Sequence, residues 1–257
     1  MNGIPAPPNG PVTKLDCATL LTKTAELGEY FALPPGVEDE WQSLPLLFDD
    51  AVLGEFVGRT RDAIAVSARC EPSSVPIKVA ASSFQLGVAA RLLSPVVGAA
   101  TCFGAVPLLD LRSVRWQSTP KHSPRFAIAD VDWVVAPTPS AAAVVISASV
   151  LAAIFGPLNE TLRSQTSLSP RVTWGNVIAA ANGAVTVLSM SQPEHEGYGR
   201  ALVRALMDTE RLADTATFAR GTFTRRSCCL FYQAPSSGLC MDCVLTESDR
   251  SHRSHRQ

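Results

Sequence analysis

The sequence predicts an α+β fold: a mostly helical body, a small antiparallel β-sheet and a cysteine-rich C-terminal segment. Three observations lead to this prediction. Apolar residues recur at helical spacing along most of the chain, and the few strand-like runs do not alternate with helices as they would in a doubly wound sheet. Four of the seven cysteines also gather near the C-terminus. With 257 residues the chain is long enough to bury a sizeable core.

The first half of the chain predicts a disordered lead and three helices. Residues 1–12 are rich in proline, which favours disorder. A helix is expected over Cys17 to Leu33, ending at Pro34-Pro35-Gly36. A second is expected over Phe48 to Val66, where apolar residues fall at helical spacing. Pro76 can open a third helix, which Ser94-Pro95 is expected to stop.

The second half predicts a strand pair followed by three helices. Val106 to Trp116 and Arg125 to Val135 carry β-branched and aromatic residues, and a turn-rich segment separates them. Helices are then expected over Ala141 to Leu162, Arg171 to Met190 and Gly199 to Thr215, the second of them capped by Ser169-Pro170. A last strand-like run, Thr222 to Ser227, is expected to end at Cys228, because neighbouring cysteines can share one site only where the backbone turns.

Charge and hydropathy narrow the class of protein. A net charge of −1 argues against bulk binding of nucleic acid. Three stretches lack charged residues, namely 92–109, 133–159 and 172–193. Because prolines interrupt the first two, and all three are rich in small residues, we interpret them as buried core helices instead of membrane spans. We expect a cytoplasmic protein, and peripheral contact with the inner face of the membrane stays open.

The cysteines near the C-terminus form the pattern Cys-Cys-x10-Cys-x2-Cys, made by Cys228, Cys229, Cys240 and Cys243. Four sulfur ligands are what an iron-sulfur cluster or a structural zinc ion requires. The intervening Pro235-Ser236-Ser237-Gly238 can reverse the chain and bring both pairs together. Structural zinc usually uses two short knuckles, and disulfides need an oxidising compartment. The spacing therefore favours an iron-sulfur cluster, with zinc and redox-active thiols as alternatives.

Three segments resemble the family of FhuF-type ferric siderophore reductases. The first is the cysteine pattern with its neighbours, from Arg225-Arg226-Ser227 to Cys243. The other two are the segment 81–95, Ala-Ser-Ser-Phe-Gln-Leu-Gly-Val-Ala-Ala-Arg-Leu-Leu-Ser-Pro, and Trp174-Gly175-Asn176. The resemblance spans residues 45–245, and its cysteine pattern is the most specific part. It implies that all four cysteines bind a 2Fe-2S cluster.

The resemblance also implies a function and a division of the chain. The expected function is ferric siderophore reduction, in which one electron passes from the 2Fe-2S cluster to siderophore-bound Fe(III) and Fe(II) is released. No catalytic residue is needed beyond the cluster. The expected regions are a disordered lead 1–12, a reductase-like body 13–218, a 2Fe-2S-binding segment 219–247 and a disordered tail 248–257. The alternatives are a 2Fe-2S electron carrier without a siderophore pocket and a zinc-stabilised binding module.

The expected partners are a ferric siderophore and an unidentified electron donor, either a protein or a small molecule. The chain lacks the glycine-rich motifs that bind nucleotide phosphates, so no bound dinucleotide is indicated. A groove is expected beside the segment 231–239, with Trp174, Asn176 and one of Arg225 or Arg226 in its walls. Because the oxidised cluster is an anion, Arg225 and Arg226 are placed to tune it. Alternation along a strand predicts one arginine near the cluster and the other exposed.

Overall fold

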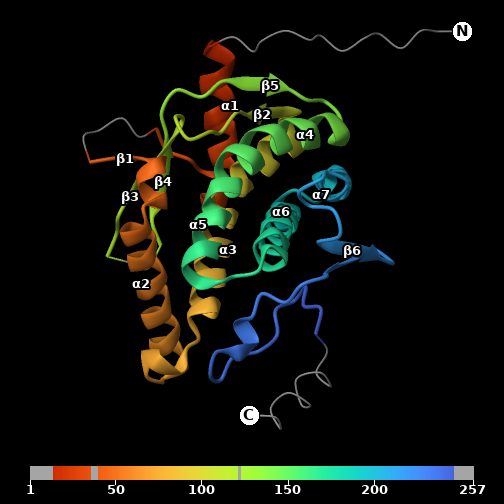
Figure 1. Ribbon diagram of the computed structural model, residues 1–257. Coiled ribbons are helices and arrows are strands. Elements are labelled where there is room, and N and C mark those ends of the chain that lie inside the picture. The colour runs from red at the N-terminus through yellow and green to blue at the C-terminus, as the bar shows by residue number, and fades with distance from the viewer. Residues whose placement is uncertain (1–13, 36–39, 121–122, 246–257) are drawn as a thin grey trace, which may run out of the picture.

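The computed structural model describes residues 14–35, 40–120 and 123–245 and has an α+β fold built around one long helix. This helix, α3 (Ile77–Phe103), packs most extensively against α6 (Pro170–Ser191) and also against α2 (Asp50–Ala68). The three helices contribute a large part, but less than half, of the main hydrophobic core. Figure 1 shows their arrangement. The lead 1–12 and the tail 248–257, both expected to be disordered, lie outside the described residues.

α3 extends past Pro95, so the prediction that Ser94-Pro95 ends it was wrong. The helix continues to Phe103 and ends at Gly104, whose φ of 61° provides a left-handed cap. Pro95 removes one backbone hydrogen bond, and the Ser94 hydroxyl donates to the Ala90 carbonyl one turn before it. Every residue from Leu92 to Thr101 is buried. Burial of this apolar surface outweighs the local cost of the proline.

The first and last helices differ from their predicted bounds. α1 spans Lys14–Glu26 and stops well before the predicted end at Leu33. Gly28 has a φ of 131°, a conformation that favours glycine, and the chain then forms the short 3-10 turn Glu29–Phe31. α7 spans Glu196–Met207, so it starts before Gly199 and ends before Thr215. The predicted helices over 48–66 and 171–190 are confirmed by α2 and α6.

The predicted helix over 141–162 is a longer helical stretch in three parts. α4 (Pro139–Ile146) passes into a π-helical stretch, Ser147–Phe155, and then into α5 (Gly156–Thr166). The Thr138 side chain caps its start, as Ser169 caps α6. The stretch 139–166 and α3 are both long and apolar enough to cross a membrane by length and composition. Two thirds of the apolar window of α3 is buried inside the protein, as in a core helix.

The strands form three small antiparallel sheets instead of one hairpin. β1 (Gln42–Ser43), β3 (Val114–Gln117) and β4 (Arg125–Ile128) make the first sheet, in the order β1-β3-β4. β2 (Ala105–Pro107) pairs with β5 (Trp133–Val135) in the second. The two predicted strands therefore do pair, but each is broken in the middle. Asp110 causes one break, because its carboxylate accepts hydrogen bonds from the backbone N–H groups of Arg112 and Ser113.

The third sheet carries the chain into the cysteine segment. β6 (Ala216–Ala219) pairs with β7 (Thr222–Arg225) through a tight turn at Arg220 and Gly221, both with positive φ. The proposed boundary between residues 218 and 219 falls near the end of β6, and the division of the chain stays a prediction. Figure 1 shows the C-terminal segment at the end of the molecule where α2 connects to α3, opposite β2 and β5.

Candidate iron-sulfur centre

The backbone of residues 225–245 brings the two cysteine pairs together. β7 ends at Arg225, whose N–H donates to the Asp242 carbonyl at 3.0 Å and so joins the strand to the second cysteine pair. Leu230, with a φ of 70°, turns the chain after the first pair. The N–H of Cys243 donates to the Cys240 carbonyl at 3.1 Å, which closes the Cys-x-x-Cys turn. The strand therefore ends before Cys228, as the need for a turn predicts.

The sulfur atoms approach one another across the two pairs. Cys229 Sγ lies 3.8 Å from Cys240 Sγ. Backbone N–H groups point at the other two sulfurs, from Leu230 to Cys228 Sγ at 3.3 Å and from Leu245 to Cys243 Sγ at 3.4 Å. Hydrogen bonds of this kind stabilise thiolates in iron-sulfur centres. Within 14–35, 40–120 and 123–245, no group of three or more His, Cys, Asp or Glu side chains is placed so that it could hold a single metal ion.

The cysteine side chains shift one another's pKa values. Hydrogen bonds from Cys228 and Cys240 lower the pKa of Cys229, and the nearby Arg225 guanidinium lowers it further. The same hydrogen bonds and burial raise the pKa of Cys228 and of Cys240. Repulsion from Cys243 also raises the pKa of Cys228. Without added positive charge, Cys228, Cys229 and Cys240 do not all ionise together, and metal ions supply that charge.

Arg225 is the most unusual charged residue near the cysteines. Its side chain is only 2% exposed, and no carboxylate among the described residues pairs with it. Its Nη2 donates to Asn176 Oδ1 at 2.6 Å, while its Nε is buried without a hydrogen-bond partner. A buried, incompletely bonded guanidinium is costly unless negative charge lies nearby. The anionic cluster that four thiolates would hold fits this requirement.

A chain of buried polar groups attaches the cysteines to the helical body. Asn176, fully buried on α6, donates to the carbonyl and the hydroxyl of Ser82 on α3, both at 3.0 Å. The Ser82 hydroxyl donates to the Cys229 carbonyl at 2.8 Å. Gly175 allows this close approach, because a Cβ there would lie 2.3 Å from the Ser227 hydroxyl. Two segments far from the cysteines in sequence thereby fix the position of the first pair.

The four predicted residues of the substrate site, Trp174, Asn176, Arg225 and Arg226, lie in different surroundings. Arg225 is buried beside Cys229, whereas Arg226 is exposed and pairs with Asp214 at 2.9 Å, in agreement with the predicted alternation. Asn176 is fully buried and lines no groove, so the expectation that it forms a groove wall was wrong. Trp174 lies in a cleft of about 540 Å³ together with Arg226, Ser227 and Val244. Whether these residues bind substrate or tune the cluster stays a prediction.

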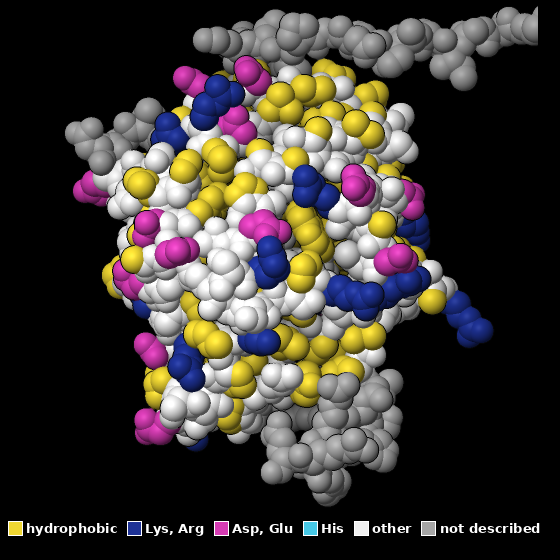
Figure 2. Space-filling model, in the orientation of Figure 1, with side chains coloured by type: hydrophobic (Ala, Val, Ile, Leu, Met, Phe, Trp, Pro, Cys, Tyr) yellow, Lys and Arg dark blue, Asp and Glu magenta, His cyan; other side chains and the backbone are white. Residues whose placement is uncertain are grey.

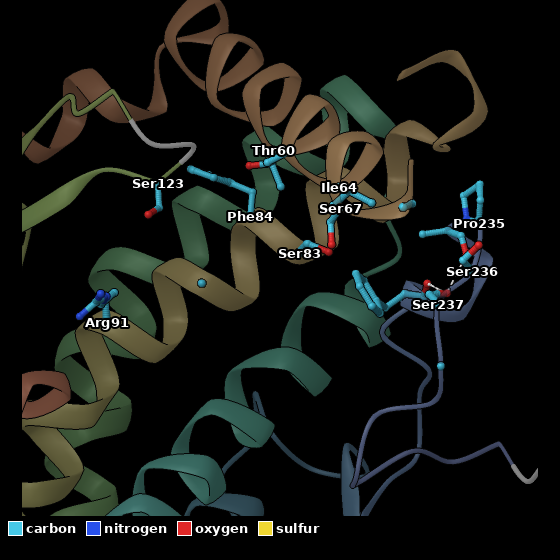
Figure 3. Close-up of a pocket in the computed structure, with 16 residues that line it drawn as sticks. Thr60, Ile64, Ser67, Ser83, Phe84, Arg91, Ser123, Pro235, Ser236 and Ser237 are labelled. Carbon is cyan, nitrogen blue, oxygen red and sulfur yellow. Dashed lines mark hydrogen bonds between the residues drawn. The ribbon is translucent and has the colours of Figure 1, made fainter. Parts of the chain in front are cut away.

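The groove expected beside residues 231–239 is present, but with other walls. A cleft of about 560 Å³ lies between α2, α3 and the segment 231–238, which joins the two cysteine pairs (Figure 3). Among the residues that the structure describes, Arg91 is the only charged one that lines it. Ser82 was not among the predicted site residues; it lies within the segment 81–95 that carries the family resemblance, but nothing in its local sequence marks it as a partner of the cysteines.

The comparison with protein families agrees with this geometry. The model of the FhuF 2Fe-2S C-terminal domain matches residues 225–245, the segment that carries all four cysteines. No curated protein in the comparison matches the chain. The four thiol donors, the N–H groups on two of them and the buried Arg225 all suit an anionic iron-sulfur cluster. Residues 225–245 therefore match the 2Fe-2S C-terminal domain of the FhuF type, and the cofactor is a 2Fe-2S cluster.

Proposed function

We propose that this protein is a ferric siderophore reductase that supplies one electron to Fe(III) held in a siderophore and so releases Fe(II). The observation that carries the proposal is the match of residues 225–245 to the FhuF 2Fe-2S domain, on a segment that borders an open cleft. When bound, the cluster supplies a one-electron redox couple. Siderophores hold Fe(III) through hard oxygen donors, and Fe(II) is a poorer partner for such ligands.

In this proposal the protein's own residues hold the cluster near the surface and set its charge environment. Cys228, Cys229, Cys240 and Cys243 would be the ligands. Arg225 lies buried on the protein side, where its positive charge favours the more negative, reduced form. Cys240 and Cys243 are only partly buried, and Met241 between them is 97% exposed. The electron therefore has only a short path between the cluster and the protein surface. No side chain has to act as a general acid or nucleophile.

The electron donor is part of the same proposal. A donor protein could reach the cluster at the exposed Met241, an apolar side chain on the surface directly beside Cys240. On the face in Figure 2, acidic and basic side chains are interspersed without a broad area of one sign, as the near-zero net charge suggests. We also propose that the protein is cytoplasmic and has no nucleic-acid partner. A second proposal is that it contacts the inner face of the membrane.

The function is tested with protein purified without oxygen. Visible and electron paramagnetic resonance spectra should show a 2Fe-2S cluster, with iron and labile sulfide in equal amounts. After stoichiometric reduction by dithionite and removal of the excess, ferric siderophore should reoxidise the cluster and yield one Fe(II) per cluster, trapped by a ferrous chelator. A colourless protein that contains zinc would support the zinc-stabilised module. Reoxidation by small acceptors but by no ferric chelate would support a plain electron carrier.

A further inference from the structure

Two clefts border the cysteine segment, and they differ in how far their polar groups are already occupied. In the cleft of Trp174, Arg226 pairs with Asp214, the Arg211 guanidinium lies 5.7 Å from the centre of the Trp174 ring, and the Ser227 hydroxyl donates to the Arg171 carbonyl. Most of its polar atoms are thus bonded within the protein. A ligand there would have to displace existing interactions, which reduces the net gain on binding.

The cleft between α2, α3 and the segment 231–238 has unoccupied donors. The hydroxyls of Ser67, Ser83 and Ser236 line it and make no hydrogen bond to any other described residue. Arg91 lies at one end, where its guanidinium sits 5.3 Å from the centre of the Tyr30 ring. Within 14–35, 40–120 and 123–245, Arg91 has no salt bridge to any carboxylate and no carboxylate lines the cleft. These groups can donate to oxygen atoms of a ligand.

The position and shape of this cleft also suit a chelate. Its volume of about 560 Å³ lies within the usual range for sites of small molecules. Phe84 and Phe231 supply aromatic surface. Figure 3 shows Arg91 at one end of the cleft and Pro235, Ser236 and Ser237 at the other. A ligand in the cleft would therefore touch the segment that joins the two cysteine pairs.

We propose that this cleft is the binding site for the ferric chelate, as a neutral or anionic complex with oxygen donors, and that Arg91 favours the anionic forms. The proposal rests on the proposed function, because it places the substrate of that reaction. Ser67 and Ser83 would donate to the ligand's oxygen atoms, and the segment 231–238 would be the wall through which the electron arrives. Trp174 would then lie outside the substrate site.

Gly87 provides a variant that fills the cleft without disturbing the helix. It lines the cleft on α3, and a Cβ built there meets no atom within 4 Å. Gly183, on α6, has equally open surroundings and lines neither of these two clefts. Gly87→Phe should therefore occupy the cleft, while Gly183→Phe is a matched control that adds the same ring to a helix elsewhere.

Binding can be measured apart from reduction by using gallium(III) complexes, which have the charge and size of the ferric ones and are not reduced. The holoprotein is titrated calorimetrically with a neutral gallium trihydroxamate and an anionic gallium tris-catecholate. We expect Gly87→Phe to weaken binding at least tenfold and Gly183→Phe to leave it unchanged. Arg91→Gln should weaken binding of the anionic complex several-fold more than that of the neutral one.

The proposal is overturned if Gly87→Phe binds both complexes like the wild type, or if Trp174→Ala loses binding while Gly87→Phe keeps it. It is also overturned if wild-type protein binds neither gallium complex but still reduces the ferric ones, a result that leaves the proposed function standing. If the wild type binds a gallium complex, Gly87→Phe weakens that binding and the ferric counterpart is nevertheless not reduced, the cleft is supported as a chelate site and the proposed reductase function fails.

Discussion

Replacing Asn176 by alanine tests whether the buried polar chain holds the cysteine segment in place. The Asn176 side chain accepts from Arg225 and donates twice to Ser82, and it is fully buried. A hydrogen bond to a charged group contributes about 1.5 to 3 kcal/mol, and a buried group left without a partner costs about 1 to 3 kcal/mol. Because Arg225 Nε already lacks a partner, we expect Asn176→Ala to lower the free energy of unfolding by about 3 to 5 kcal/mol.

The assay is anaerobic denaturation of the holoprotein by urea, followed by circular dichroism and by loss of the cluster's visible absorbance. Asn182→Ala is the control, since Asn182 lies on the same helix and accepts from Arg200 at a partly exposed site. Because the site is partly exposed and Arg200 also donates to Thr186 and Glu196, this loss should cost about 0.5 to 1.5 kcal/mol, less than a buried bond to a charged group. Only Asn176→Ala should also shorten the lifetime of the cluster in folded protein. Equal costs for the two variants, with equal cluster lifetimes, would show that the buried chain does not support the centre.

Three further predictions concern the cysteines and arginines. Cys240→Ser should abolish the 2Fe-2S spectrum, whereas Cys102→Ser should leave it intact; a full complement of iron in Cys240→Ser would contradict the ligand assignment. Arg225→Met should lower the reduction potential of the cluster by tens of millivolts, because a buried positive charge is lost. Arg226→Met removes an exposed ion pair and should change the potential little. Redox titration followed by electron paramagnetic resonance compares the two variants, and equal shifts in potential would refute the predicted difference. Burial, with a smaller effect of Glu194, raises the pKa of Cys102 to about 11. This thiol should therefore stay protonated at pH 8 and react with iodoacetamide more slowly than a free thiol. Mass spectrometry measures the rate, and alkylation as fast as that of a free thiol would contradict the protonated state.

Local sequence determined the parts of this protein that depend on neighbouring residues. The cap at Ser169, the helices over 50–68 and 170–191, and the turn between the cysteine pairs all follow from residue types at short spacing. The cysteine pattern indicated a metal centre, because few other arrangements of four thiols form in so short a segment. The alternation of a strand also predicted that Arg225 and Arg226 would lie in different environments.

Tertiary structure decided what depends on distant contacts. Pro95 predicts a helix end on local grounds, yet α3 continues because the core buries every residue from Leu92 to Thr101. Similarly, Trp174-Gly175-Asn176 gives no indication in sequence that Gly175 makes room for Ser227, or that Asn176 bonds Arg225 and leaves no surface for substrate. The cleft at Arg91 forms only where α2, α3 and the segment 231–238 meet. Packing brings these segments together across more than a hundred residues, and spacing along the chain carries no information about such distances.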